Sequence, residues 1–301
     1  MKTKKQNRLQ LSRTIALSAV LAFSCTAAFL ILTQSQSMPL FIDAAVVKQA
    51  YFSAPRGITF YERKSIVTKR GNFSIDLARI DLGRGKIKII SDTAAKADCK
   101  NNCPAKALKN YVDSHHGFAG MHGAYFCPPD YSWCKGKVNY YFYPFYNTQD
   151  KFLINAGEIK WLQGSILVFD QNNKAYFFLD GRTFKGLTQF EQKYNTKIQA
   201  LISNSPGLIV NGKNIIASQR MDNKQLTTKG NRGAIGVRGS VVYLVIARSA
   251  TVPDLASIME ALKVDTALNL DGGGSSALYW NGQYKVGPGR LLPTAIIFKE
   301  G

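Results

Sequence analysis

A glycine-rich segment near the carboxyl end holds the residues best suited to chemistry. At positions 266–278 the sequence TALNLDGGGSSAL brings Asn269 and Asp271 to the end of a strand-like stretch, followed by three glycines and two serines. Glycine lets a backbone adopt positive φ and approach a ligand closely, and successive free N–H groups can form a concave anion site. A carboxylate beside such a site would repel the same anion unless it acts on the substrate. We therefore predict that Asp271 is a base or a nucleophile; the alternatives are a carboxylate that orders the loop and a cation ligand.

The elements expected around this segment are mostly strands, because hydrophobic residues alternate with polar ones and turn residues recur at short intervals. Asn-Gly pairs between apolar runs, at 211–212 and 281–282, are typical of tight hairpins. The stretches that predict strands or pairs of strands are Gly85–Asp92, Ser165–Asp180, Leu208–Ser218, Val241–Ala247 and Ala277–Val286.

Helices are expected to be few. Pro253–Lys263 predicts one, because a proline stands in its first turn, Thr251 can cap it and its apolar residues share one face. A second is expected to cover Pro104–Val112. With 46% hydrophobic and 19% charged residues the chain can form a core, which excludes disordered, collagen-like and coiled-coil proteins. The predicted class is α+β: a single strand-rich domain with few helices, behind an amino-terminal signal anchor.

The amino terminus indicates export. Residues Ile15–Leu32 form an uncharged apolar run, and five cations precede it. At about 18 residues the run is just long enough to span a bilayer. Such a segment is a signal peptide or a signal anchor whose basic flank stays in the cytoplasm. We favour the anchor, which would attach an extracytoplasmic body, periplasmic or at the cell surface, to the membrane. The expected organisation is a signal or anchor segment at 1–37, a connector at 38–56 and the functional domain at 57–301.

Four cysteines lie in the body of the chain: Cys99, Cys103, Cys127 and Cys134. An even number in an exported chain is typical of two disulfides. Three pairings are open, and we expect the local one, Cys99–Cys103 with Cys127–Cys134. A zinc site is the less favoured alternative, because the second spacing is unusual for zinc and export favours oxidation. The aromatic-rich stretch 127–150 is then a long loop closed by a disulfide, and its aromatic residues either pack the loop down, which we favour, or line a sugar site.

The charge balance is strongly basic, with 39 Lys and Arg against 19 Asp and Glu, a net charge of +20. Removing the five amino-terminal cations leaves about +15 on the exported part, which suits polyanionic partners such as phosphorylated glycans. No helix-turn-helix, zinc finger or aromatic RNA-binding signature is present, so nucleic acid is not expected as a partner.

Four further segments accompany the glycine-rich loop in order along the chain: GMHGAYF (120–126), SPGLIVNG (205–212), NRGAIGV (231–237) and GPGRLLPTAIIF (287–298). Together with NLDGGGSS they resemble the motifs of the phosphodiester glycosidase family. These are exported proteins related to the N-acetylglucosamine-1-phosphodiester alpha-N-acetylglucosaminidase known as the uncovering enzyme, and bacterial members are often labelled exopolysaccharide-biosynthesis proteins. The resemblance runs through roughly residues 57–300. It implies hydrolysis of a sugar-1-phosphodiester at the anomeric bond.

The resemblance also implies a set of site residues. Arg232 matches the arginine of the family's R-T-A-I-G segment, and a guanidinium suits a pair of phosphodiester oxygens; a structural ion pair is the alternative. Asn269 and Asp271 match the family's N-x-D pair, Asp271 as the catalytic residue and Asn269 as a substrate-binding one. The other substrate-binding residues implied are Gly272, Gly273, Gly274, Ser275, Arg290 and Tyr125.

Two positions depart from the family pattern. His122 stands where the family has asparagine, and Gly233 stands where it has threonine. His122 is a second catalytic candidate, as an acid or as a hydrogen-bonding group; alternatively it is a packed neighbour of the site. The change marks either altered specificity or lost activity.

The leading hypothesis is an exported hydrolase that releases a sugar from a sugar-1-phosphodiester or from a phosphate-containing envelope glycan. The alternatives on the same scaffold are a non-catalytic module that binds glycans or polyanions, and a transferase of polysaccharide assembly. No cofactor or metal is expected, apart from the alternative of a divalent cation near Asp271. The expected partners are an anionic glycan and, through residues 15–32, the cell membrane.

Overall fold

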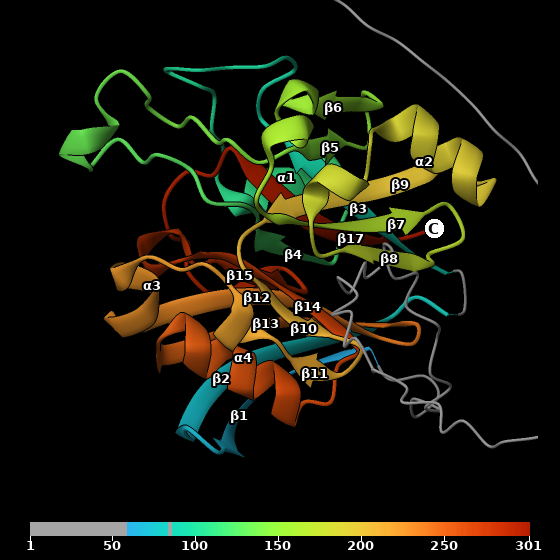
Figure 1. Ribbon diagram of the computed structural model, residues 1–301. Coiled ribbons are helices and arrows are strands. Elements are labelled where there is room, and N and C mark those ends of the chain that lie inside the picture. Colours follow the sequence, from blue (N-terminus) through green and yellow to red (C-terminus); the bar gives the residue numbers. More distant parts are fainter. Residues whose placement is uncertain (1–58, 84–85) are drawn as a thin grey trace, which may run out of the picture. The chain divides into compact units, whose positions relative to one another are not determined.

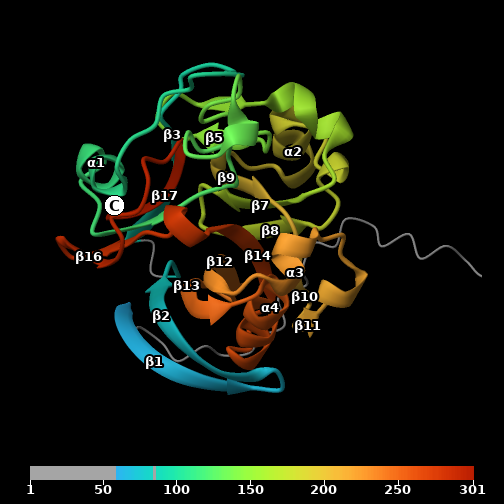
Figure 2. The ribbon, with the colours of Figure 1, turned by 90° about the vertical axis from the view of Figure 1, so that its left-hand side faces the viewer.

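The computed structural model describes residues 59–83 and 86–301, and its strands form three sheets in which every pair of neighbours is antiparallel (Figure 1). The largest sheet has seven strands in the order β1-β2-β13-β12-β14-β10-β11. Figure 2 shows the long β1–β2 hairpin at one edge of this sheet. Its strands are β1 (Phe60–Thr68), β2 (Gly71–Asp81), β10 (Gly207–Val210), β11 (Lys213–Asn214), β12 (Gly230–Arg238), β13 (Val241–Ala250) and β14 (Thr266–Gly272).

The two smaller sheets have five strands each, in the orders β16-β15-β4-β17-β3 and β6-β5-β9-β7-β8. The first consists of β3 (Ile87–Thr93), β4 (Ala119–His122), β15 (Leu278–Trp280), β16 (Gln283–Val286) and β17 (Thr294–Glu300). The second consists of β5 (Phe145–Asn147), β6 (Phe152–Ile154), β7 (Ser165–Asp170), β8 (Ala175–Phe178) and β9 (Ile198–Asn204).

Four α-helices and five short 3₁₀ turns occur in the described residues. The helices are α1 (Leu108–Ser114), α2 (Leu187–Tyr194), α3 (Asn223–Thr227) and α4 (Val252–Ala261). The 3₁₀ turns are η1 (Ser132–Cys134), η2 (Ala156–Trp161), η3 (Gly181–Thr183), η4 (Ile216–Ser218) and η5 (Gly273–Ser275). The prediction of a strand-rich α+β domain with few helices is confirmed for this part of the chain.

The main core lies where the inner faces of all three sheets meet. One buried cluster joins Leu244 of β13, Phe298 of β17 and Phe169 of β7. A second cluster joins the outer face of the large sheet to Leu255 and other apolar residues of α4. Because β13 lies between these two clusters, its residues are buried on both faces, which explains why VVYLVIA is continuously apolar rather than alternating.

Local sequence signals set several elements. Thr251 caps α4 and forms a reciprocal capping box with Asp254, and a proline occupies the first turn, as the sequence predicted. Asn211 and Gly212 have φ of +50° and +73°, which is the left-handed conformation that a tight two-residue hairpin requires. The same conformation recurs at Asn281 and Gly282, between β15 and β16. The helix expected to cover Pro104–Val112 spans Leu108–Ser114, so it begins and ends later than predicted.

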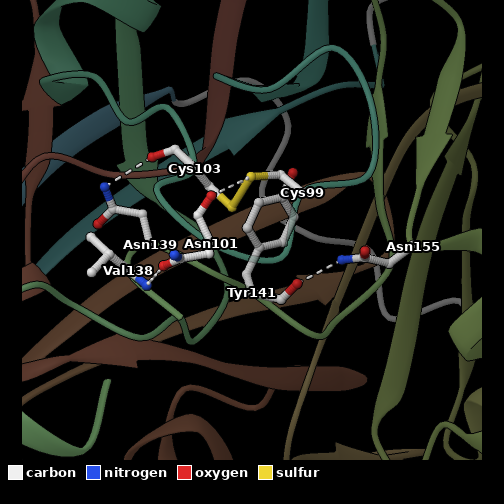
Figure 3. The surroundings of a disulfide bond; sticks show 7 residues. All are labelled: Cys99, Asn101, Cys103, Val138, Asn139, Tyr141 and Asn155. Carbon is white, nitrogen blue, oxygen red and sulfur yellow. Dashed lines mark hydrogen bonds between the residues drawn. A yellow bond between two sulfur atoms is a disulfide. The ribbon is translucent and has the colours of Figure 1, made fainter. Parts of the chain in front are cut away.

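Both disulfides have the local pairing, Cys99–Cys103 and Cys127–Cys134, so that prediction is confirmed. The first closes a short loop that is hydrogen-bonded to residues 138 and 139 (Figure 3). There the Val138 N–H donates to Asn101 Oδ1 at 2.8 Å, and Asn139 Nδ2 donates to the Cys103 carbonyl at 3.0 Å. The Asn139 N–H in turn donates to the carbonyl of Cys127 at 2.7 Å. The two disulfide-closed loops are therefore tied to each other.

The signal or anchor segment at 1–37, with its apolar run at 15–32, and the connector at 38–56 lie outside the described residues. In the part of the chain that the structure does describe, no helix combines the length and the apolar character needed to cross a membrane.

Candidate active site

A cavity of about 400 Å³ lies where β12, the glycine-rich loop, α3 and the Cys127–Cys134 loop come together. Seven of the ten site residues predicted from the sequence line it: Tyr125, Arg232, Asp271, Gly272, Gly273, Ser275 and Arg290. Three do not: His122, Asn269 and Gly274.

Strand pairing brings the charged residues together. β12 and β14 are neighbours, and their register sets Arg232 opposite Gly272, next to Asp271. The chain then turns sharply through η5, where Gly273 has φ of +57°. A Cβ on Gly272 would lie 2.6 Å from the Asn231 carbonyl oxygen, so glycine is needed for the two backbones to approach this closely. The sequence motif thus positions the carboxylate beside the arginine through backbone geometry.

Asp271 is partly exposed and lines the cavity. Burial raises its pKa from 3.8 to about 6, although a hydrogen bond from the Gly272 N–H, the Ser275 hydroxyl and the charges of Arg290 and Arg232 all favour the ionised form. A carboxyl group with this pKa exchanges a proton readily near neutral pH. That property suits a general base or acid better than a carboxylate that only orders the loop.

Arg232 is 8% exposed, and its guanidinium donates hydrogen bonds to three backbone carbonyls. Its Nε donates to Ala250 O at 3.2 Å, and its Nη2 donates to Thr228 O at 2.5 Å and to Lys224 O at 3.2 Å. Across residues 59–83 and 86–301 no carboxylate lies within ion-pair distance of this guanidinium, so the structural ion pair considered for it is not formed there. A buried cation held only by neutral groups leaves its charge available to an anion in the cavity.

Arg290 differs, because a carboxylate already binds it. Its Nε donates to Asp130 Oδ1 at 2.9 Å and its Nη2 to Asp130 Oδ2 at 2.5 Å, and the guanidinium lowers the pKa of Asp130. Gly274 lies behind the arginine, and a Cβ there would be 2.6 Å from Nη1. The role of Gly274 is therefore to leave room for Arg290 at the cavity wall.

Tyr125 connects the cavity to the residues beneath it. Its hydroxyl oxygen accepts hydrogen bonds from Asn269 Nδ2 at 2.8 Å and from Gln225 Nε2 at 3.3 Å, and burial raises its pKa. Asn269 is fully buried and also donates to Ser205 O at 3.0 Å. Asn269 therefore supports Tyr125 from below and has no surface in the cavity.

His122 is fully buried under the glycine-rich loop. Its Nδ1 accepts from the Ala277 N–H at 3.2 Å, which leaves Nε2 to donate to the Asp271 carbonyl at 2.8 Å. Burial lowers its pKa, which favours this neutral form. A Cβ on Gly233 would collide with the imidazole and lie 2.8 Å from the Asp271 carbonyl oxygen. The two departures from the family pattern, His122 and Gly233, are thus in contact, with the ring filling space that a side chain at 233 would need.

Sequence reasoning missed the contribution of α3 and of the Cys127–Cys134 loop. Lys224 and Gln225 of α3, Lys229 just after it, and Tyr131 and Trp133 of the loop all line the cavity. One signal was available: Asp222 and Gln225 form a capping box that marks the start of a helix. Nothing in the sequence indicates that this helix lines the same cavity as the glycine-rich loop.

No group of three or more His, Cys, Asp or Glu side chains gathers in a way that could hold a metal ion within residues 59–83 and 86–301. The charges of Arg232 and Arg290 act on Asp271 and lower its pKa. Both guanidinium groups would therefore repel a divalent cation at this carboxylate.

Comparison with known proteins agrees with the motifs. Residues 134–299 match the family model of the phosphodiester glycosidases. The chain belongs to the phosphodiester glycosidase family. The matched range begins after His122, Tyr125 and Trp133, so it does not bear on their roles.

Two solved structures have the same fold as this phosphodiester glycosidase chain. One is the catalytic domain of zebrafish N-acetylglucosamine-1-phosphodiester alpha-N-acetylglucosaminidase, auto-inhibited by its pro-peptide, with 16% identity, a TM-score of 0.60, and coverage of 83% of this chain and 86% of that one. The other is a hypothetical protein from Synechocystis, with 13% identity, a TM-score of 0.60 and coverage of 83% of this chain. The match spans 64% of the length of the Synechocystis chain. A search of curated protein sequences found no match.

Proposed function

We propose that this protein is an extracytoplasmic hydrolase that releases a sugar from a sugar-1-phosphodiester, either a small diester or a phosphate-containing glycan. The observation that carries the proposal is the pairing of two groups in one cavity. One is a buried arginine that has no carboxylate partner among residues 59–83 and 86–301, and the other is a carboxyl group whose pKa is raised to about 6. The first suits the phosphate of a diester, and the second suits proton transfer or attack at the neighbouring anomeric carbon. The family match supports the reaction class.

Arg232, Arg290 and the backbone N–H groups of the glycine-rich loop would bind the phosphate. In the reaction the bond between the anomeric carbon and the bridging phosphate oxygen breaks, and that oxygen leaves as part of a phosphate monoester. A phosphate monoester is a weak base, so its departure does not require a strong acid. The arginines would stabilise the negative charge that accumulates on it.

Asp271 would activate the water molecule that attacks the anomeric carbon. In its ionised form the carboxylate accepts one proton from this water, while the hydroxide equivalent bonds to carbon and yields the free sugar. Attack by the carboxylate itself, followed by hydrolysis of the glycosyl ester, is the second route. In both routes the ionised carboxylate is the reactive form.

We assign His122 a positioning role in this proposal. Its ring bonds to the backbone of Asp271 and Ala277, at the two ends of the glycine-rich loop, and has no exposed surface. The ring would therefore fix the loop that carries the carboxylate, and would not contact substrate.

The extracytoplasmic location rests on the two disulfides, which persist in oxidising compartments. The anchor through residues 15–32 stays a prediction, since that segment lies outside the described residues. The basic composition, with a net charge of +20, supports an anionic glycan as partner.

The test is turnover of a defined panel by the full-length, disulfide-bonded protein. Sugar-1-phosphodiesters and nucleotide sugars would be incubated with the enzyme, and free sugar would be measured by chromatography. Asp271→Asn should lower kcat by about 10²–10⁴, the usual range for loss of a general base. Arg232→Lys should lower kcat/KM by at least about tenfold, because lysine cannot reproduce the planar fork of donors.

Two exposed residues outside the cavity provide matched controls: Asp150→Asn and Arg182→Lys should leave turnover unchanged. Turnover that survives Asp271→Asn would remove that residue from the reaction. If the folded protein releases no sugar from any substrate, the hydrolase proposal is wrong. Glycan binding without turnover would then favour a binding module, and sugar transfer to an added acceptor glycan would favour a transferase.

A further inference from the structure

Trp133 is an exposed tryptophan at the wall of the cavity. The residue is 69% exposed, and it is one of those that line the cavity. An exposed aromatic ring at the wall of a cavity offers a flat apolar face to a ligand that enters the cavity. Trp161 of η2 is equally exposed, at 67%, but lies outside the cavity. It therefore serves as an internal comparison.

The backbone under Trp133 is fixed from several sides. The residue lies in η1, directly before Cys134, which is fully buried and bonded to Cys127. The Cys134 N–H donates to Tyr131 O at 2.8 Å, and the Cys127 N–H donates to Tyr140 O at 2.8 Å. The neighbouring disulfide loop braces the same segment through residues 138 and 139 (Figure 3). A ligand that binds this ring therefore needs to order little of the chain.

Tyr131 joins Trp133 to the cations of the cavity. The two rings lie 5.6 Å apart between centroids, tilted by 35°. On the tyrosine ring, Lys224 Nζ lies 4.6 Å from the centroid and the Arg290 guanidinium 5.2 Å. Lys224 Nζ also donates to the tyrosine hydroxyl at 3.2 Å. Tyr131 thus contacts the cations Lys224 and Arg290 and lies next to the ring of Trp133.

We propose that Trp133, supported by Tyr131, forms a carbohydrate subsite that stacks on a pyranose ring next to the scissile phosphodiester. The C–H face of a pyranose is flat and apolar and fits an indole ring, while its hydroxyls point sideways to water and polar groups. The inference rests on the proposed function and deepens it, because it assigns to Trp133 the sugar unit that lies next to the phosphodiester. The two roles considered for the aromatic residues of the loop then belong to different residues. Tyr141 packs in the core, and Trp133 binds substrate.

The test separates carbohydrate binding from turnover. Isothermal calorimetry would measure binding of neutral maltopentaose, cellopentaose and chitopentaose to the full-length protein. We expect binding of at least one of them. For that sugar, Trp133→Ala should weaken the affinity about tenfold, roughly the contribution of one stacked aromatic contact. Trp133→Phe should retain most of the affinity, and Trp161→Ala should retain all of it.

Three results would overturn the inference: no binding of any of the sugars by wild type, undiminished binding by Trp133→Ala, or an equal loss in Trp161→Ala. Since both tryptophans are exposed, neither variant removes core packing. Turnover supplies a second readout. For a diester with an oligosaccharide aglycone, Trp133→Ala should raise KM about tenfold and leave kcat unchanged, while a methyl aglycone should show no change. If no substrate is turned over, the proposed hydrolase fails, but the calorimetry still decides the subsite.

Discussion

Replacing Asp271 with asparagine should stabilise the folded protein, and should do so more strongly as the pH rises. Asparagine keeps the oxygen that accepts the Gly272 N–H bond of 2.7 Å, so the substitution mainly removes a charge. In the folded protein burial raises the pKa of this carboxyl from 3.8 to about 6. Ionised Asp271 therefore destabilises the folded state, and the asparagine variant lacks this destabilisation.

The sign and size of this change in stability follow from the difference in proton binding between the folded and unfolded states. The folded state holds the proton more tightly than the unfolded chain, so the wild type keeps its full stability below about pH 3.8 and loses it as the pH rises through about 6. A shift of this size corresponds to about 3 kcal/mol once the group is fully ionised. Between about pH 4.5 and about pH 7.5 the stability advantage of the variant should grow by about 2 kcal/mol.

Urea denaturation followed by circular dichroism would measure this advantage on full-length protein with its disulfides intact. Wild type and Asp271→Asn would be compared at the two pH values. The exposed Asp150→Asn variant would serve as the control for removal of one negative charge at the surface. If the advantage of Asp271→Asn is constant across this range, the carboxyl is not held at a raised pKa, and its assignment as the base loses its physical basis.

Three further outcomes are expected. On the acid side, kcat/KM should fall about tenfold per pH unit below about pH 6, because Asp271 must be ionised to act; a flat profile there would contradict this role. Gly233→Thr should destabilise the fold by about 1–3 kcal/mol through collision with the His122 ring. Adding His122→Asn should recover part of this loss, measured by urea unfolding in a double-mutant cycle. Strictly additive effects of the two substitutions would show that the two positions do not interact. Tyr125→Phe should lower the free energy of unfolding by about 1–3 kcal/mol in the same assay, because it removes the oxygen that accepts a hydrogen bond from the buried Asn269. An unchanged free energy of unfolding would mean that this hydrogen bond does not stabilise the fold.

The sequence predicted the strand-rich class and much of its detail where local chemistry decides the conformation. Asn-Gly pairs marked two hairpins, and Thr251 with the following proline marked α4. The local disulfides were also predicted, because export and an even cysteine count favour them. Arg232 and the glycine-rich loop were predicted as parts of one site through their family motifs, and the pairing of β12 with β14 brings them together.

The orientation of side chains could not be predicted. All four residues of β4 are buried, so the alternation that separates core from surface in a strand gives no information about His122. The segment around Trp133 has no period at all, and the ring is placed at the cavity by the turn η1 that carries it and by its contact with Tyr131. Lys224 reaches the site through the packing of α3, a helix of five residues whose position depends on tertiary contacts rather than on its own sequence.

The contact between His122 and Gly233 also limits how the sequence of this protein can diverge. The imidazole occupies the space of a side chain at position 233, so the two positions cannot drift independently. If Gly233 were substituted first, the new side chain would collide with the histidine ring. If His122 were substituted first, only a small void would be left. Relatives with histidine at the first position should therefore keep glycine at the second, 111 positions further along in this chain. A search pattern that requires one fixed residue type at each position would miss such relatives. A pattern that allows the two residue types to change together would find them.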